Sequence, residues 1–141
     1  MQDVLSLYRL AEERGIDVDL RPLRRVPSLS LSMDWAEGRC AVALDPDQVA
    51  GTADEKVKLG HELGHCLTGS FYNRYAACDL RRRHELRADR WAIAHLIPHK
   101  ELKAAIAKGV REVWELAEYF EVTEEFMKKA LAHYGLLDRA D

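Results

Sequence analysis

Long apolar runs, a basic leader and an excess of one charge are all missing from this sequence of 141 residues. A membrane-spanning helix needs roughly 18 or more consecutive apolar residues, and no stretch of the sequence reaches that length. The first segment, MQDVLSLYRLAEERG, contains acidic residues and lacks the basic start and continuous apolar segment of a signal peptide. These absences predict a cytoplasmic protein.

The charges are nearly balanced, with 21 basic and 24 acidic residues and a formal net charge of −3. This balance gives no basic excess to attract nucleic acid or an acidic membrane surface, so we expect neither as a partner. Hydrophobic residues make up 48% of the chain, enough for one compact core, whereas the length is short for two. We expect a monomer with a single domain.

Cysteines are few and odd in number: Cys40, Cys66 and Cys78. Their spacing matches no disulfide framework and no zinc knuckle. We therefore expect three reduced cysteines that pack as small hydrophobic residues in a reducing compartment.

Apolar periodicity predicts an α+β fold in which a small antiparallel sheet precedes a set of helices. A helix is expected at 3–14 and a short strand at 16–20. Leucine and serine alternate after residue 27, which predicts a hairpin with strands near 28–35 and 40–44. The N-terminal helix and the sheet would occupy 1–50.

Two long helices are expected in 52–97, followed by C-terminal helices in 98–135. The stretch TADE, from Thr52 to Glu55, has the pattern of a capping box that starts the first long helix. Asp79 is a candidate cap for the second, and Thr123 for the last.

The segment KLGHELGHCLTG, residues 58–69, carries an H-E-x-x-H motif on an amphipathic helix. His61 and His65 lie one turn apart, the separation that lets two imidazoles reach one zinc ion. Glu62 lies beside them, where its carboxylate could reach a metal-bound water. Gly60 and Gly64 each cost about 1 kcal/mol in a helix interior, so we expect them to make room for a neighbouring strand or a bound substrate.

A third ligand is needed, and the helix at 80–97 offers Glu85 and Asp89 on its inward side. Buried carboxylates are strongly unfavourable unless they are neutralised, hydrogen-bonded or metal-bound. We assign Glu85 as the third ligand and Asp89 as the acceptor of a hydrogen bond from a ligand imidazole. The alternative is that both carboxylates pair with arginines at a helix contact. Other candidate ligands are His84, His95 and His99, of which the first two point away from Glu85.

Three blocks, HELGHCLTGSFYN, ELRADRWAIAHLIP and ELAEYFEVTEEFMKKAL, resemble the ImmA/IrrE family of zinc metallopeptidases over about residues 40–134. The resemblance implies a zincin-type helical domain of the gluzincin class, with H-E-x-x-H on a central helix. It also implies that His61, His65 and Glu85 bind zinc and that Glu62 is catalytic. Members are commonly carried by phages and other mobile elements, where they cleave a helix-turn-helix repressor and release its genes.

In a zinc peptidase, Glu62 would accept a proton from the attacking water and pass it to the departing amine. The oxyanion needs a donor, for which the candidates are Tyr72, Tyr75, His84 and His95. The strand near 40–44 could be a sheet edge that accepts the substrate as an added strand. The alternative is that it is an ordinary interior strand.

Two rival functions stay open. The C-terminal helices at 110–134 have the helix-turn-helix layout of a DNA-binding module, but residues 101–141 contain six lysines and arginines against nine acidic residues. The other rival is an anti-repressor that binds its partner without cleaving it.

Overall fold

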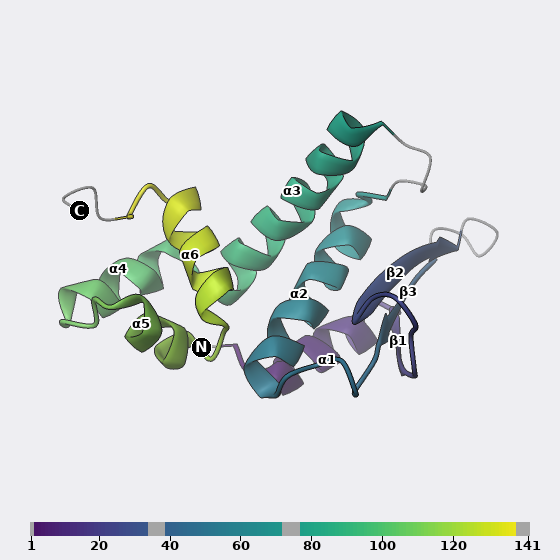
Figure 1. Ribbon diagram of the computed structural model, residues 1–141, viewed down its shortest axis with the longest axis horizontal. Helices are drawn as coiled ribbons and strands as arrows, with labels where there is room; N and C mark the ends of the chain where they lie inside the picture. The colour runs from purple at the N-terminus through teal and green to yellow at the C-terminus, as the bar shows by residue number, and fades with distance from the viewer. Residues whose placement is uncertain (1, 34–38, 72–76, 138–141) are drawn as a thin grey trace.

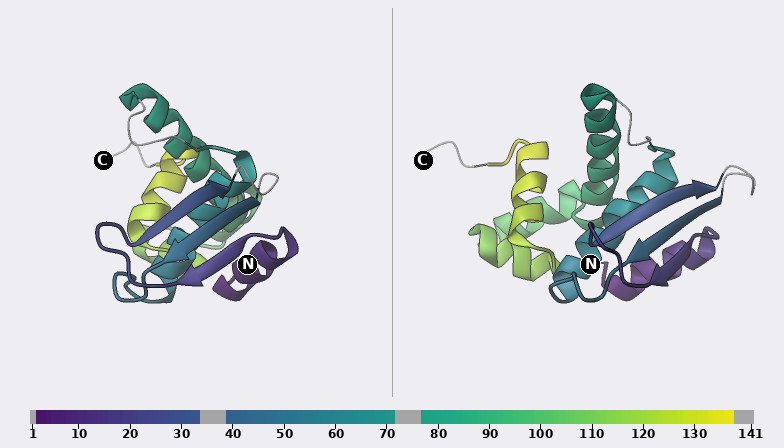
Figure 2. Two further views of the ribbon diagram at one scale, coloured as in Figure 1. Left: turned by 90° about the vertical axis from the view of Figure 1, so that its right-hand side faces the viewer. Right: turned by 45° about the vertical axis from the view of Figure 1, so that its right-hand side comes forward.

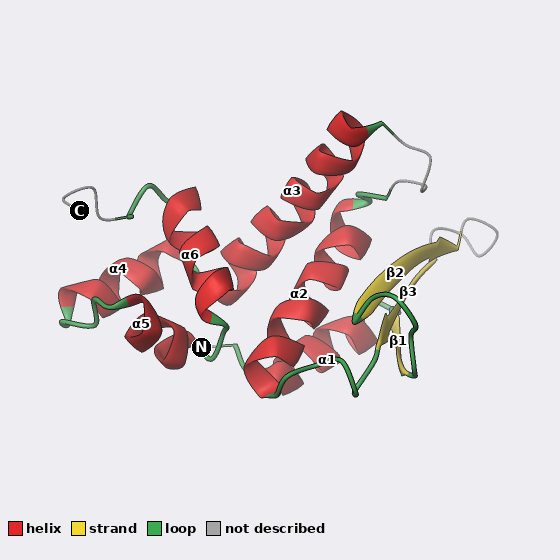
Figure 3. Ribbon diagram, in the orientation of Figure 1, coloured by secondary structure: helices red, strands yellow, loops and turns green. Residues whose placement is uncertain are grey.

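The computed structural model describes residues 2–33, 39–71 and 77–137. Within them it has six helices and one three-stranded sheet (Figures 1 and 3). The helices are α1 (Val4–Glu13), α2 (Thr52–Thr68), α3 (Cys78–Leu96), α4 (His99–Ala107), α5 (Val113–Phe120) and α6 (Glu124–His133). The strands are β1 (Asp17–Leu20), β2 (Ser28–Met33) and β3 (Arg39–Leu44). The predicted α+β class is therefore confirmed.

The sheet is mixed, not antiparallel as predicted, and its strand order is β1-β3-β2. The hairpin pairs β2 antiparallel to β3, while β1 pairs parallel to the other side of β3. Of the two alternatives for the strand near 40–44, the edge strand is wrong and the interior strand is confirmed, because β3 is the central strand. Four of its six residues, Cys40, Val42, Ala43 and Leu44, are buried, which suits a strand with two neighbours. The serine-rich strand β2 is an edge.

Helix α2 lies between the sheet and α3, and contacts both (Figure 1). The two further views show α1 below α2, with α4, α5 and α6 gathered on the other side of the molecule from the sheet (Figure 2). Leu59 and Leu63 of α2 are fully buried and belong to the main hydrophobic core. One face of α2 therefore packs in the core, and this packing determines where the opposite face, which carries the histidines, points.

The two helix interior glycines make room for α3, not for a strand or a substrate. A Cβ atom on Gly64 would lie 2.5 Å from the backbone oxygen of Ala88. A Cβ atom on Gly60 would lie 3.0 Å from Cδ1 of Leu96. The small residues on both helices thus let α2 and α3 approach closely, which determines what their facing side chains can reach.

Two predicted helix caps do not form. Gly51, with φ 90°, is the N-cap of α2, and no side chain caps that helix. Asp54 instead accepts a hydrogen bond from the Ala50 backbone N–H at 2.9 Å. The N-cap of α3 is Ala77, so Asp79 lies in the first turn, where its charge still favours the helix dipole. The third cap forms, because the Thr123 hydroxyl accepts from Phe126 N–H at 3.2 Å.

Two of the cysteines form a disulfide, which corrects the expectation of three reduced thiols. Cys40 of β3 and Cys66 of α2 are bonded, with Cα atoms 5.7 Å apart. Only the packing of the sheet against α2 brings these residues together, so their spacing in sequence could not reveal the pair. Cys78 is free and exposed.

Lys56 joins α2 to the C-terminal helices from inside the protein. Its side chain is fully buried, and Nζ donates to the backbone oxygen of Phe120 at 2.6 Å. Burial lowers the pKa of Lys56, an effect that nearby Glu121 opposes. This contact places a cation at the C-terminal end of α5, where the helix dipole favours it. None of the described helices is both long and apolar enough to span a bilayer.

Candidate metal centre

Three side chains from two helices converge in one place. His61 and His65 come from α2, and Glu85 comes from the facing part of α3. Their ligand atoms all lie within 4.8 Å of one another. In the described part of the chain, this is the one group of three or more histidine, cysteine and acidic residues that is close enough to hold a metal ion.

The distances within this group suit a small tetrahedral ion. The two Nε2 atoms of His61 and His65 are 3.2 Å apart. Glu85 Oε2 is 2.7 Å from His61 Nε2 and 3.3 Å from His65 Nε2. Ligands at about 2.0–2.1 Å from a tetrahedral zinc lie roughly 3.3 Å from one another. The two separations from His65 Nε2 match this value, whereas Glu85 Oε2 and His61 Nε2 lie at hydrogen-bond distance. The donor set therefore fits zinc in chemistry and in two of its three separations.

The other ring nitrogen of each histidine is held by an oxygen. Asp89 Oδ1 lies 2.8 Å from His61 Nδ1, and the backbone oxygen of Ser70 contacts His65 Nδ1. An oxygen acceptor at Nδ1 favours the tautomer with its proton there, which leaves the Nε2 lone pair for a metal. Both imidazoles are thus oriented with Nε2 toward the same point.

The site concentrates negative charge around His61. Burial disfavours the charged form of His61, but hydrogen bonds with Asp89 and Glu85 outweigh it and raise its pKa to about 10. Burial likewise opposes ionisation of Asp89, whose pKa is nevertheless lowered by its hydrogen bond with His61. Lys129 of α6 lies 3.6 Å from the other oxygen of Asp89. Carboxylates that stabilise a proton on His61 also favour a divalent cation at the same place.

Glu62 is buried beside the histidines, and its exposed fraction is only 6%. Its Oε2 atom accepts a hydrogen bond from the Ser28 hydroxyl at 2.7 Å. Ser28 begins β2 and comes from a segment 34 residues earlier in the chain. The edge strand therefore holds the carboxylate that the motif places next to the candidate ligands.

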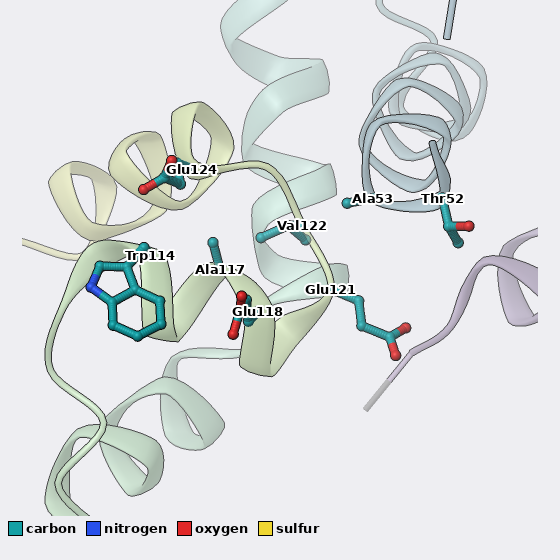
Figure 4. A pocket seen from close by; sticks show the side chains of 8 residues that line it. All are labelled: Thr52, Ala53, Trp114, Ala117, Glu118, Glu121, Val122 and Glu124. Carbon is teal, nitrogen blue, oxygen red and sulfur yellow. The ribbon is translucent and has the colours of Figure 1, made fainter. Parts of the chain in front are cut away.

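A cleft of about 490 Å³ opens between β2 and α2 and contains these groups. Its wall on the sheet side is formed by Ser28, Leu29 and Ser30, and Phe71 lies at the other side near His65. A larger cavity of about 570 Å³ lies elsewhere, at the start of α2 beside α5 and α6 (Figure 4). That cavity is lined by Trp114 and glutamates and contains no histidine, so its size does not make it the metal centre.

The alternative histidines lie away from this cleft or have other contacts. His95 stacks on Trp91 with ring centroids 4.8 Å apart, and it lines a cavity with residues of α1. It is therefore not placed to donate to an oxyanion in the cleft. His99 stacks on Tyr134 at 4.4 Å. His84 does not line the cleft. Tyr72 and Tyr75, the other candidate oxyanion donors, lie outside the described residues.

Two residues with a place in the site could not be found from the motif. Ser28 reaches Glu62 from the sheet, and Ser70 is a buried residue that orients His65 through its backbone oxygen. The serines at alternate positions of β2 gave one signal, since they mark a polar face. The contact from Ser70 uses its backbone oxygen, which every residue has, so the sequence gives no sign of it.

A family model described as the IrrE N-terminal-like domain, of the M78 peptidases, matches residues 46–132. The match covers more than half of the 141 residues. The chain belongs to this family. Membership indicates a metallopeptidase, and the matched region contains all three converging residues as well as Glu62. It does not contain Ser28 or the sheet. A comparison with curated proteins found no match.

Proposed function

We propose that this M78 family member is a zinc-dependent endopeptidase whose metal is held by His61, His65 and Glu85. The observation that carries the proposal is the orientation of the two imidazoles, whose Nδ1 atoms contact oxygens while both Nε2 atoms approach Glu85. When bound, zinc supplies a Lewis acid that lowers the pKa of water and polarises a peptide carbonyl. The role of the chain is to position that ion and to move protons.

Glu62 is the general base in this proposal. It takes a proton from the attacking water at its carboxylate and delivers it to the departing amine. Ser28 occupies one carboxylate oxygen with a hydrogen bond of 2.7 Å, and so leaves the other oxygen for the reacting groups. Asp89 keeps the proton on His61 Nδ1 and thereby fixes the ring for metal binding.

The substrate lies along β2 as an added strand. This strand is an edge of the sheet and lines the cleft with Ser28, Leu29 and Ser30. Backbone hydrogen bonds to an edge strand select an extended peptide and give little sequence preference, so the pockets beside it supply specificity. Packed helices cannot adopt this conformation without local unfolding. Cleavage is therefore confined to linkers and helix connections of the substrate.

The substrate is a helix-turn-helix repressor of a phage or mobile element, and cutting it releases the repressed genes. This part of the proposal is supported by the resemblance to the ImmA/IrrE family and not by the geometry of the cleft. The C-terminal helices are not the DNA reader, because α6 begins with Glu124 and Glu125, where phosphate contacts would be expected.

The test is digestion of a candidate repressor, the product of the neighbouring gene, compared with unfolded casein. The zinc-loaded protein should cut the repressor slowly at one or a few bonds, and Glu62→Gln should not. Rapid breakdown of casein with the repressor untouched would indicate a general peptidase. If the unmodified protein and Glu62→Gln both bind the repressor tightly and neither cleaves it, the chain is an anti-repressor that acts by occlusion.

A further inference from the structure

The disulfide lies at a junction between the sheet and the helix that carries the candidate ligands. Cys40 is in the central strand β3, and Cys66 follows directly after His65 in α2. The two cysteines are 26 residues apart in sequence, and the bond closes a loop that contains most of β3, the connection to α2 and about four turns of α2. It therefore restrains the sheet and α2 relative to each other.

A cavity of about 250 Å³ gives access to this bond from outside. Both cysteines line it, together with Arg14 at the end of α1 and Arg39, the neighbour of Cys40. Both arginines are exposed, and neither guanidinium forms an ion pair with any residue that the structure describes. The entrance to the disulfide is thus hollow and positively charged.

We propose that this cavity is a thiol–disulfide exchange site that takes small thiols carrying a negative charge. Cys66 is half-buried while Cys40 is only 5% exposed, so Cys66 is the more accessible of the two residues and is assigned as the one attacked. The arginines attract the anionic group of the thiol, and the exchange switches the restraint between β3 and α2 on or off. The site belongs to this chain regardless of whether it cleaves peptides.

The exchange takes two thiols and two steps. The thiolate of the first attacks Cys66 Sγ, a mixed disulfide forms, and Cys40 leaves as a thiolate that takes up a proton. The thiolate of the second attacks the sulfur of the bound thiol, so that Cys66 leaves and a small disulfide is released. The two small thiols lose two electrons in total, and the protein disulfide gains them. The reverse steps, with a small disulfide as oxidant, close the bond again.

The experiment compares 2-mercaptoethanesulfonate, which is anionic, with 2-mercaptoethanol, which is neutral and of similar size. Alkylation and mass spectrometry count free thiols over time, from one in the closed form to three in the open form. Each rate is divided by the rate of the same thiol with an uncharged small disulfide, which removes differences in intrinsic reactivity. We expect a normalised preference of roughly 10-fold for the anionic thiol at low salt, with the preference reduced by added salt.

The double variant Arg14→Gln, Arg39→Gln should abolish the preference, and Arg82→Gln, an exposed arginine of α3, should retain it. Opening the bond should also speed amide hydrogen exchange in β3 and in the last turns of α2, but not in α6. Equal normalised rates, a preference that survives in the double variant, or a bond that resists both thiols would overturn the proposal. So would unchanged hydrogen exchange after reduction.

Discussion

The two cavities along α2 show why volume is a poor guide to a metal centre. The larger one, at the start of the helix, is lined by Glu118, Glu121 and Glu124 together with Trp114. Figure 4 shows these carboxylates pointing in different directions. In the smaller cleft, ligand atoms of three residues come within 4.8 Å of one another. Convergence of ligand atoms, imposed by two closely packed helices, distinguishes the candidate site from an acidic groove.

The largest expected effect is on catalysis in the smaller cleft. Glu62→Gln should lower peptide hydrolysis by at least about 10²-fold, because an amide cannot take the proton. Zinc content should be unchanged, as Glu62 is not in the converging group. The matched control is Glu118→Gln in the larger cavity, which should cleave as well as the unmodified chain. Equal losses of peptide hydrolysis in Glu62→Gln and Glu118→Gln would show that the smaller cleft is not the specific site of catalysis.

The next largest effect is expected on zinc affinity when the contact between Asp89 and His61 is removed. Asp89→Asn preserves the shape but removes the negative charge that lies 2.8 Å from His61 Nδ1 and that is proposed to hold a proton there. We expect zinc affinity to fall by about 10- to 100-fold, measured by competition with a chromophoric chelator. Glu124→Gln, which changes a charge in the other cavity, should leave the affinity alone. An Asp89→Asn protein with undiminished affinity would show that the contact does not tune the site.

The close approach of α2 and α3 can be tested through its two glycines. Gly64→Ala would place Cβ against the Ala88 backbone, so the free energy of unfolding should fall by about 1–3 kcal/mol. In Gly60→Ala the tight contact is with the end of the Leu96 side chain, Ala92 Cβ lies at an ordinary 3.8 Å, and the helix propensity of alanine offsets the contact. Chemical denaturation of both variants gives the comparison. A Gly64→Ala protein as stable as Gly60→Ala would mean that the helices can separate without cost.

The smallest effect on stability is expected for Trp114, whose indole lines the larger cavity. Trp114 is 53% exposed, so Trp114→Ala should change the free energy of unfolding by no more than about 0.5 kcal/mol. Zinc affinity should not change. A clear loss of zinc in this variant, seen by elemental analysis, would show that the larger cavity affects metal binding and would contradict the distinction between the two cavities.

Local patterns predicted the helices and the hairpin well, because periodicity and helix stops act within a few residues. The two faces of α2 followed from the positions of Leu59 and Leu63 relative to the histidines. The inward carboxylates of α3 likewise identified Glu85 and Asp89 as residues that need a partner. All of these inferences concern which side of one element a residue occupies.

Features that depend on how elements pack could not be predicted in the same way. The parallel pairing of β1 with β3 and the bond from Cys40 to Cys66 join segments whose spacing carries no signal. The contact of Ser28 with Glu62 depends on which strand becomes the edge, and the sequence did not decide whether the strand at 40–44 was an edge or an interior strand. The capping box predicted at Thr52 does not form, because the N-cap is Gly51 and Thr52 is already the first residue of the helix.

Zinc binding by the chain and by Glu85→Ala tests the central claim most directly. Glu85 is the proposed ligand that no H-E-x-x-H motif specifies, and its Oε2 atom lies 2.7 Å from His61 Nε2. The unmodified chain should bind one zinc ion, and Glu85→Ala should lose more than the roughly 10- to 100-fold in affinity expected for a residue that only orients a ligand. Full zinc occupancy and undiminished affinity in Glu85→Ala would contradict the assignment of the metal centre.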